Sequence, residues 1–303
     1  MNRSKMPIPD PPEAPLLLPF EPGPYRLAMG LHACPEADWI QIDARYRAEL
    51  GLRRALLDLR RDEVLGVDPA TAPARREVLE LLAAHLPARF PAWFGCEPGR
   101  RLRNRLTGEV WTLADPGSDP LEVAARLVQE DMCLLRLDGT TPILTDAALC
   151  FPSRWRLTEK LGRPLTAVHH PVPGYADRLA DPVDRFLSAL RPGRIVQRAN
   201  WGVVDDPALF QPAAPAAGTV ITKADAGDRL WLRVERQTLR RLAISGAILF
   251  TIRVQVAAFS RLAAAPERAR LAAALRALPE ATERYKNLTT LREAALAFLD
   301  AHA

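Results

Sequence analysis

Apolar residues in the first 130 positions recur with the period of amphipathic helices. In 36–59 they return at three- and four-residue intervals, and Asp38 is placed to cap the start of a helix. Residues 72–86 repeat the pattern more regularly, and Pro87 is expected to end that helix. Residues 120–130 show the same spacing. The sequence therefore predicts helices over these three stretches.

Beyond residue 130 the apolar positions come in short runs typical of strands. The runs 132–137 and 143–151 flank the turn dipeptide Asp138-Gly139 and predict a hairpin. A helical interval follows at 155–190. Further strands are predicted at 194–204, 229–239 and 247–259, and helical spacing returns at 267–278 and 290–301.

Two strands, a helical interval and three more strands follow one another in the order of a PAS-like domain. We therefore predict an α+β fold with a PAS-like antiparallel sheet core at about 129–259 and helical additions at both ends. Residues 25–303 are expected to form one domain. Residues 1–24 are rich in proline and lack periodicity, so they are predicted to be an extended arm on the surface or on a partner. A PAS-like core holds its ligand between the helical interval and the sheet.

Composition narrows the class of protein. Hydrophobic residues make up 48% and charged residues 25% of the chain, as in folded globular proteins. No apolar run reaches the ~20 residues of a membrane span, and prolines interrupt the apolar residues near the start, so we expect a cytoplasmic protein without a targeting segment. The net charge is only +5 and no basic run occurs, so nucleic-acid binding is not expected.

Motifs of common enzyme classes are missing. The four cysteines, at 34, 96, 133 and 150, form no C-x-x-C pair, which argues against a zinc knuckle or a dithiol redox site. The sequence also lacks G-x-G, G-x-x-x-x-G-K, H-E-x-x-H and G-x-S-x-G. Nothing in it therefore predicts a site for nicotinamide, flavin or an iron–sulfur cluster.

His169 and His170 form the one cluster of histidines, in the string AVHHPVPGY. Consecutive side chains diverge, so the two histidines are not expected to chelate one metal ion together. One of them is suited to be a single axial ligand, because the prolines that follow restrict the backbone. The alternative is a turn histidine that is hydrogen-bonded to a nearby carbonyl group.

The last three predicted strands supply a second candidate site. Alternation places Arg198 and Asn200 on one face of their strand. In the next two strands the polar faces are formed by Trp231, Arg233, Glu235 and Gln237 and by Thr251, Arg253 and Gln255. If the strands pair, several arginines and one glutamate project from the same side. This side is either a solvated face with weak ion pairs or a pocket wall, in which arginines neutralise cofactor carboxylates and Glu235 binds a cation or exchanges protons.

Seven strings, in order, resemble the alpha subunit of the haem-dependent oxidative N-demethylase family. They are LVQEDMCLL, LCFPSRWRLTEKLGRPL, VHHPVPGY, VQRANW, LWLRVERQTLRRL, GAILFTIR and RYKN. The resemblance covers about 25–299, which is nearly the whole chain.

The resemblance implies a b-type haem (heme b) in a PAS-like fold and oxygen-dependent demethylation of a small secondary amine such as dimethylamine, with release of formaldehyde. It further implies electrons from NADPH through a partner flavin and iron–sulfur reductase, and a tetrahydrofolate-binding partner that receives the formaldehyde. Carried over by motif, His169 is the axial iron ligand, and Arg198 and Glu235 fall in the pocket motifs. His170 stands where the family pattern has no histidine, which leaves ligation by His170 open.

Two other functions compete with the enzyme. A PAS-like haem or gas sensor would use the same pocket without turnover, although such sensors usually carry an output domain that is not evident here. A haem-free interaction protein would use the histidines and strand arginines only as structural residues. An absorption spectrum distinguishes a haem-free interaction protein from a haem enzyme or a haem sensor. Amine-dependent oxygen consumption then distinguishes the enzyme from the sensor.

Overall fold

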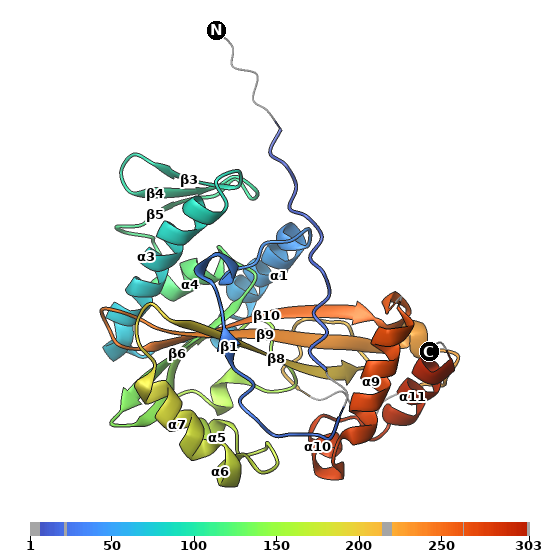
Figure 1. Ribbon diagram of the computed structural model, residues 1–303. Coiled ribbons are helices and arrows are strands. Elements are labelled where there is room, and N and C mark those ends of the chain that lie inside the picture. The colour runs from blue at the N-terminus through green and yellow to red at the C-terminus, as the bar shows by residue number, and fades with distance from the viewer. Residues whose placement is uncertain (1–6, 21–22, 214–219, 263, 302–303) are drawn as a thin grey trace.

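An antiparallel sheet runs through the centre of the molecule in the computed structural model, which describes residues 7–20, 23–213, 220–262 and 264–301 (Figure 1). Within these residues seven strands pair in the order β1-β8-β9-β10-β6-β7-β2. Their bounds are β1 His32–Ala33, β2 Leu65–Gly66, β6 Asp131–Asp138, β7 Thr141–Ala148, β8 Ile195–Val204, β9 Trp231–Arg241 and β10 Ile248–Ala258. This sheet, together with the helices around it, confirms the predicted α+β class.

The predicted hairpin and the last three strands are present. β6 and β7 pair around Asp138-Gly139, and Gly139 has φ 59°, a conformation that glycine adopts without a Cβ clash. β8, β9 and β10 pair side by side along almost their full lengths. Their alternating apolar and polar residues therefore form two continuous faces, and the register decides which side chains share a face.

Helices cover both faces of the sheet (Figure 1). The helices α1, α3 and α4 lie on one face, α5, α6 and α7 lie on the other, and α9, α10 and α11 pack at one end. The main helices are α1 Tyr46–Leu59, α3 Ala72–Arg89, α4 Pro120–Ala125, α5 Leu165–Val168, α6 Tyr175–Arg178, α7 Ala180–Ala189, α9 Ala265–Ala277, α10 Glu280–Tyr285 and α11 Arg292–Ala301, and the short ones are α2 Arg61–Val64 and α8 Ala226–Arg229.

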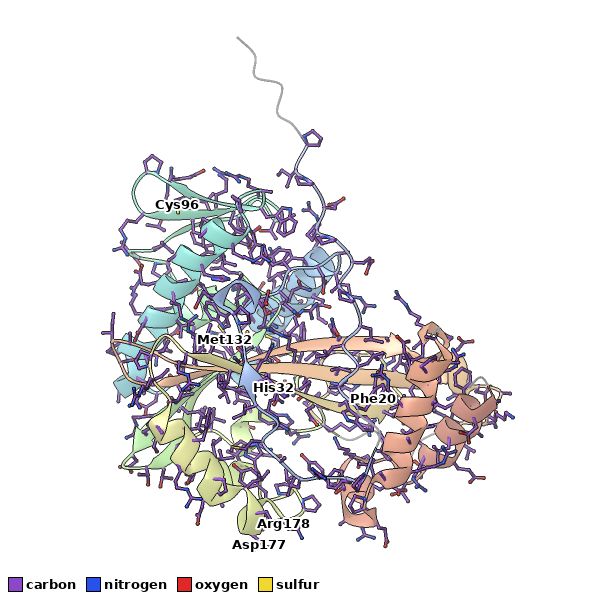
Figure 2. The ribbon with its side chains drawn as sticks, viewed as in Figure 1. Phe20, His32, Cys96, Met132, Asp177 and Arg178 are labelled. Carbon is purple, nitrogen blue, oxygen red and sulfur yellow. The ribbon has the colours of Figure 1, made fainter. Side chains whose placement is uncertain are left out.

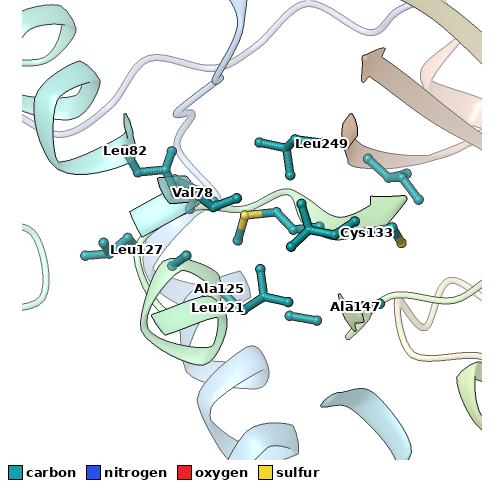
Figure 3. Close-up of a cluster of buried hydrophobic side chains, with 14 of the residues drawn as sticks. Val78, Leu82, Leu121, Ala125, Leu127, Cys133, Ala147 and Leu249 are labelled. Atoms are coloured by element: carbon teal, nitrogen blue, oxygen red, sulfur yellow. The ribbon is translucent and has the colours of Figure 1, made fainter. Parts of the chain in front are cut away.

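The largest hydrophobic core lies between the sheet and the helices of the first half of the chain. Val78 and Leu82 of α3 face Leu121 of α4 and Leu249 of β10, and each is completely buried (Figure 3). A second cluster joins the other end of the sheet to α9 and α11, with Leu271 and Leu299 among its buried members. Burial of these apolar side chains stabilises the helical additions on the sheet.

Three predicted helix bounds were wrong. The first helix begins at Tyr46 and not near Asp38, because the Asp43 carboxylate accepts from the Arg45 amide (2.9 Å) and fixes the chain before the helix. α3 continues through Pro87 to Arg89, since a proline in the last turn removes one hydrogen bond without ending the helix. α4 ends at Ala125, well before residue 130.

A small sheet was not predicted. It comprises β3 Phe94–Glu97, β4 Arg101–Asn104 and β5 Val110–Thr112, which pair antiparallel beside α3 (Figure 1). These strands are three or four residues long and β4 carries two arginines, so their sequence lacks an extended apolar alternation.

The described part of the predicted arm, residues 7–20, has no helix or strand and lies along the chain's own body. The Leu17 amide donates to Gln255 Oε1 (2.9 Å) on β10, and the carbonyl of Pro12 accepts from the Ala44 amide (2.9 Å). Phe20 is buried near the C-terminal helices (Figure 2). Residues 1–6 and 21–22 of the predicted arm lie outside the described residues.

Candidate functional site

A cavity of about 540 Å³ lies between the sheet and the helical interval that contains α5, α6 and α7. One wall consists of side chains from β8, β9 and β10. Residues 25–31, which precede β1, form a second wall, and residues 285–287 at the end of α10 form a third. This volume falls in the range of sites for cofactors and other small molecules, about 300–1,000 Å³.

His169 lies in the cavity wall directly after the single turn of α5. Its Nδ1 is 2.9 Å from the carbonyl oxygen of Leu165. A carbonyl only accepts, so Nδ1 carries the proton and Nε2 keeps its lone pair. Burial lowers the pKa of His169 to about 4, and the ring stacks on Tyr175 with centroids 4.5 Å apart. The imidazole is therefore neutral at pH 7, held in one orientation, and ready to bind a metal through Nε2.

His170 differs from its neighbour. Its side chain is exposed and is not part of the cavity wall. The two histidines diverge as expected, and only His169 is brought to the cavity.

Arg198 and Glu235 share the cavity face of the sheet, as predicted. Arg198 lies opposite Gln237 in the β8–β9 register, and Asn200 lies opposite Glu235. The Glu235 carboxylate accepts from Gln237 Nε2 (3.1 Å). Arg198 is half-buried, and its Nε is buried without a hydrogen-bond partner in the described structure. Burial lowers the pKa of Arg198, while the nearby Glu235 raises it, and the guanidinium stays charged.

Arg233 also lines the cavity, but most of its donors are already used. Its Nη atoms donate to the carbonyl oxygens of Phe151 (2.8 Å), Ala208 (3.2 Å) and Leu209 (3.2 Å). The side chain therefore fastens two loops to the sheet and adds a buried positive charge beside Glu235. Its Nε has no partner among the described residues.

The third arginine of the predicted polar face lies elsewhere. Val254, and not Arg253, lies opposite Glu235 in the β9–β10 register, so Arg253 projects from the other face of the sheet. There it binds Asp43 (2.6 Å) and Glu49 (2.9 Å). On β10 the cavity is lined by the apolar side chains Phe250 and Ile252.

Sequence reasoning assigned no role to several other polar residues of the cavity. The Tyr175 hydroxyl is buried and has no hydrogen-bond partner among the described residues. Tyr25 and Tyr285, from opposite ends of the chain, line the cavity and are partly exposed, so the cavity reaches solvent near them. Lys286 follows Tyr285 and lies in the same wall. Tyr175 ends the string VHHPVPGY, and Lys286 lies in the string RYKN. Their presence in these two family-like strings was the sequence feature that could have identified them as site residues.

The described residues contain no group of three or more His, Cys, Asp or Glu side chains able to hold a metal ion. Cys133 lines the cavity, but burial raises the pKa of its thiol, so it remains protonated and is a poor metal ligand. The cavity thus offers one neutral imidazole, buried cations and one carboxylate from the sheet. These groups suit a cofactor that brings most of its own metal ligands and carries negative charge.

No helix in the part of the chain described by the structure is long and apolar enough to cross a membrane. A family model with the description "Haem-dependent oxidative N-demethylase, alpha subunit-like" matches residues 30–296, which is most of the chain.

Proposed function

Because the chain belongs to the haem-dependent oxidative N-demethylase alpha-subunit-like family, we propose that it is the haem-containing subunit of an oxygen-dependent N-demethylase for a small secondary amine. At the coarse level of the family, the chain belongs with haem-dependent oxidoreductases. In the proposed reaction, dimethylamine, O₂, two electrons and two protons give methylamine, formaldehyde and water.

The residues of the cavity fit a b-type haem. The observation that carries the proposal is the orientation of His169, whose Nδ1–H is held by the Leu165 carbonyl while Nε2 has no hydrogen bond in the described structure. Haem-binding histidines and other metal-ligating histidines are commonly held in this way. The fold supports the PAS-like prediction as well, because β6 and β7, the helical interval and β8 to β10 enclose the cavity in the predicted order.

Each cavity residue has a defined task in this proposal. When bound, haem supplies the activation of oxygen and the electron chemistry. His169 would hold the iron through Nε2. Arg198 and Arg233 provide positive charge for cofactor carboxylates, and the free Nε of Arg198 is available to donate a hydrogen bond. The apolar side chains of Phe250 and Ile252 limit access of water on the same wall.

Glu235 is the proposed residue for the amine. A dialkylammonium ion enters a buried site at low cost only if a carboxylate compensates its charge. Glu235 is the carboxylate that β9 presents to the cavity, and its hydrogen bond with Gln237 holds it in place. Binding the cation through a charge-assisted hydrogen bond orients the N-methyl group, and the same carboxylate is placed to exchange a proton.

Partners complete the proposed system. The sequence has no motif for nicotinamide, flavin or an iron–sulfur cluster, so we propose that NADPH reduces the haem through a flavin and iron–sulfur reductase subunit. A tetrahydrofolate-binding subunit would receive formaldehyde, and we expect this complex in the cytoplasm. Purified protein on its own should therefore not oxidise NADPH. Amine turnover by the isolated chain with NADPH would contradict this part of the proposal.

Oxygen uptake tests the enzymatic function. The purified, haem-loaded chain is given a supplied reductant and either dimethylamine or methylamine, which lacks a second methyl group. We expect oxygen consumption that depends on dimethylamine and matches the formaldehyde released. A haem spectrum with no amine-dependent uptake, for any small secondary amine tested, would indicate a haem protein without turnover.

A further inference from the structure

Lys286 occupies a fixed position in the cavity wall. The left-handed conformation of Asn287 (φ 54°) ends α10, and the Leu288 amide donates to the Glu283 carbonyl (3.0 Å). The Leu288 side chain is completely buried in the cluster under α9 and α11. The backbone of Lys286 is thereby held between a helix end and a packed leucine, while its side chain reaches β8.

The ammonium of Lys286 contacts only neutral groups. Its Nζ donates to Asn200 Oδ1 (3.1 Å) and to the carbonyl oxygen of Trp201 (2.5 Å), and it lies 5.6 Å from the centroid of the Trp201 ring. Within the described chain no salt bridge joins it to a carboxylate, although Glu235 lies near enough to influence its charge. Burial lowers the pKa of Lys286 to about 8. One of its three N–H groups has no acceptor among the described residues.

A neutral donor would satisfy the same two acceptors. Lys286 is half-buried, and withdrawing an ammonium from water without a counter-ion in contact is costly, so its presence points to an anion that enters the cavity. Arg198 is a second cation of this kind, because it makes no salt bridge in the described structure. Arg198 and Asn200, which binds Lys286, are two residues apart on β8, or about 7 Å along the strand. The pair of cations suits a ligand with two carboxylates.

We propose that Lys286 binds one carboxylate of the anionic cofactor in this cavity and that Arg198 binds the other. The inference rests on the proposed function, under which the cofactor is haem b with its two propionate groups. The inference adds Lys286, which follows α10, to the cofactor-binding residues. The bound cofactor would then connect the C-terminal helices to the sheet.

Haem release provides the test. Haem-loaded protein is mixed with excess apomyoglobin, and the transfer is followed by Soret absorbance for wild type, Lys286→Met, Lys286→Arg and the exposed control Lys223→Met. We expect haem to leave Lys286→Met at least about tenfold faster, and to leave Lys286→Arg and Lys223→Met within about threefold of wild type. If Lys286→Met does not fold, Lys286→Gln replaces it with the same expectation. A release rate within twofold of wild type for the uncharged variant would overturn the inference.

The dependence on pH separates charge from a structural role. Glu235, Arg198, Tyr25 and Tyr285 surround the lysine from β8, β9, the segment before β1 and α10. As pH rises from 7 to 9 the lysine of the haem-free protein loses its proton, so the Kd of wild type for added haem should rise. Lys286→Arg remains charged and should lose most of this rise in Kd. The same rise in Kd for both proteins would overturn the inference, whereas a wild-type chain that binds no haem would contradict the proposed function itself.

Discussion

The two faces of the central sheet bury similar side chains in different ways. On the face that carries α1, Arg253 binds the carboxylates of Asp43 and Glu49, and Gln129 donates to both carboxylates. On the cavity face, Arg198 makes no salt bridge and Glu235 accepts only from Gln237 in the described structure. Both faces contain arginine and glutamate; Arg253 and Glu49 are buried, and Arg198 and Glu235 are half-buried. A charged side chain withdrawn from water therefore indicates a ligand site here where no opposite charge pairs with it, and where salt bridges pair it, as for Arg253, it fastens one layer to another.

Loss of Arg253 should have the largest effect on stability. Arg253→Met leaves two buried carboxylates without their cation, and breaking such a cluster costs about 3–5 kcal/mol. Urea unfolding of the haem-free protein should show this loss, while the exposed control Arg191→Met stays within about 0.5 kcal/mol of wild type. A loss no larger than that of the control would mean that the paired face does not hold the layers together.

Glu235 should affect turnover and not the fold. Glu235→Gln keeps the size of the side chain but removes the charge that binds the amine or exchanges a proton, so turnover at saturating amine should fall by about 10²-fold. The haem spectrum and the urea midpoint should change little. Turnover at the parent rate would show that the carboxylate is only a solvated strand residue.

Arg198 is the counterpart of Arg253 on the other face. Because its guanidinium has no salt bridge to lose in the described structure, Arg198→Met should change the free energy of unfolding of the haem-free protein by no more than about 1 kcal/mol. Haem binding or turnover should weaken, since a cation that serves the cofactor is gone. If Arg198→Met lowered the free energy of unfolding as much as Arg253→Met, Arg198 would also hold the layers together, and the proposed difference between the two faces would be wrong.

The pH dependence of stability at Glu130 tests the α1 side of the sheet further. It is buried on the α1 side, its Oε1 accepts from the Gln41 amide (2.9 Å), and Oε2 has no partner among the described residues. Burial raises the pKa of Glu130, so its contribution to stability is complete below the unfolded pKa of about 4.3 and is lost as pH rises through the folded value. Glu130→Gln should become the more stable protein as pH rises toward 7, by on the order of 1 kcal/mol. Parallel stability profiles from pH 4.5 to 7 for the two proteins would contradict this assignment.

Local periodicity was sufficient for the strands β6 to β10 and for the shared face of Arg198 and Glu235. Alternation fixes which side of a strand a residue takes, and long pairings make the faces continuous. The face of the sheet from which Arg253 projects depends on the pairing register between β9 and β10. The sequence of one strand alone does not determine that register. The delayed start of α1 has a similar cause, because Asp43 is held by residues more than 80 positions away.

The rest of the cavity depends on packing between distant segments. Lys286 reaches β8 only because α10 packs at that end of the sheet, and residues 25–31 form a wall only because the chain crosses beneath the sheet to β1 (Figure 1). Neither segment has a periodic pattern that indicates these contacts. His169 was predicted from its motif, and its hydrogen bond with Leu165 follows from the single turn of α5.

The absorption spectrum of two adjacent alanine variants tests the central claim most directly. His169→Ala and His170→Ala remove neighbouring imidazoles, of which only the first lines the cavity. We predict that wild type purifies with a Soret band, that His169→Ala loses the haem or shifts the band, and that His170→Ala leaves it nearly unchanged. A wild-type protein without a Soret band after haem addition, or a band that depends on His170 and not on His169, would contradict the account.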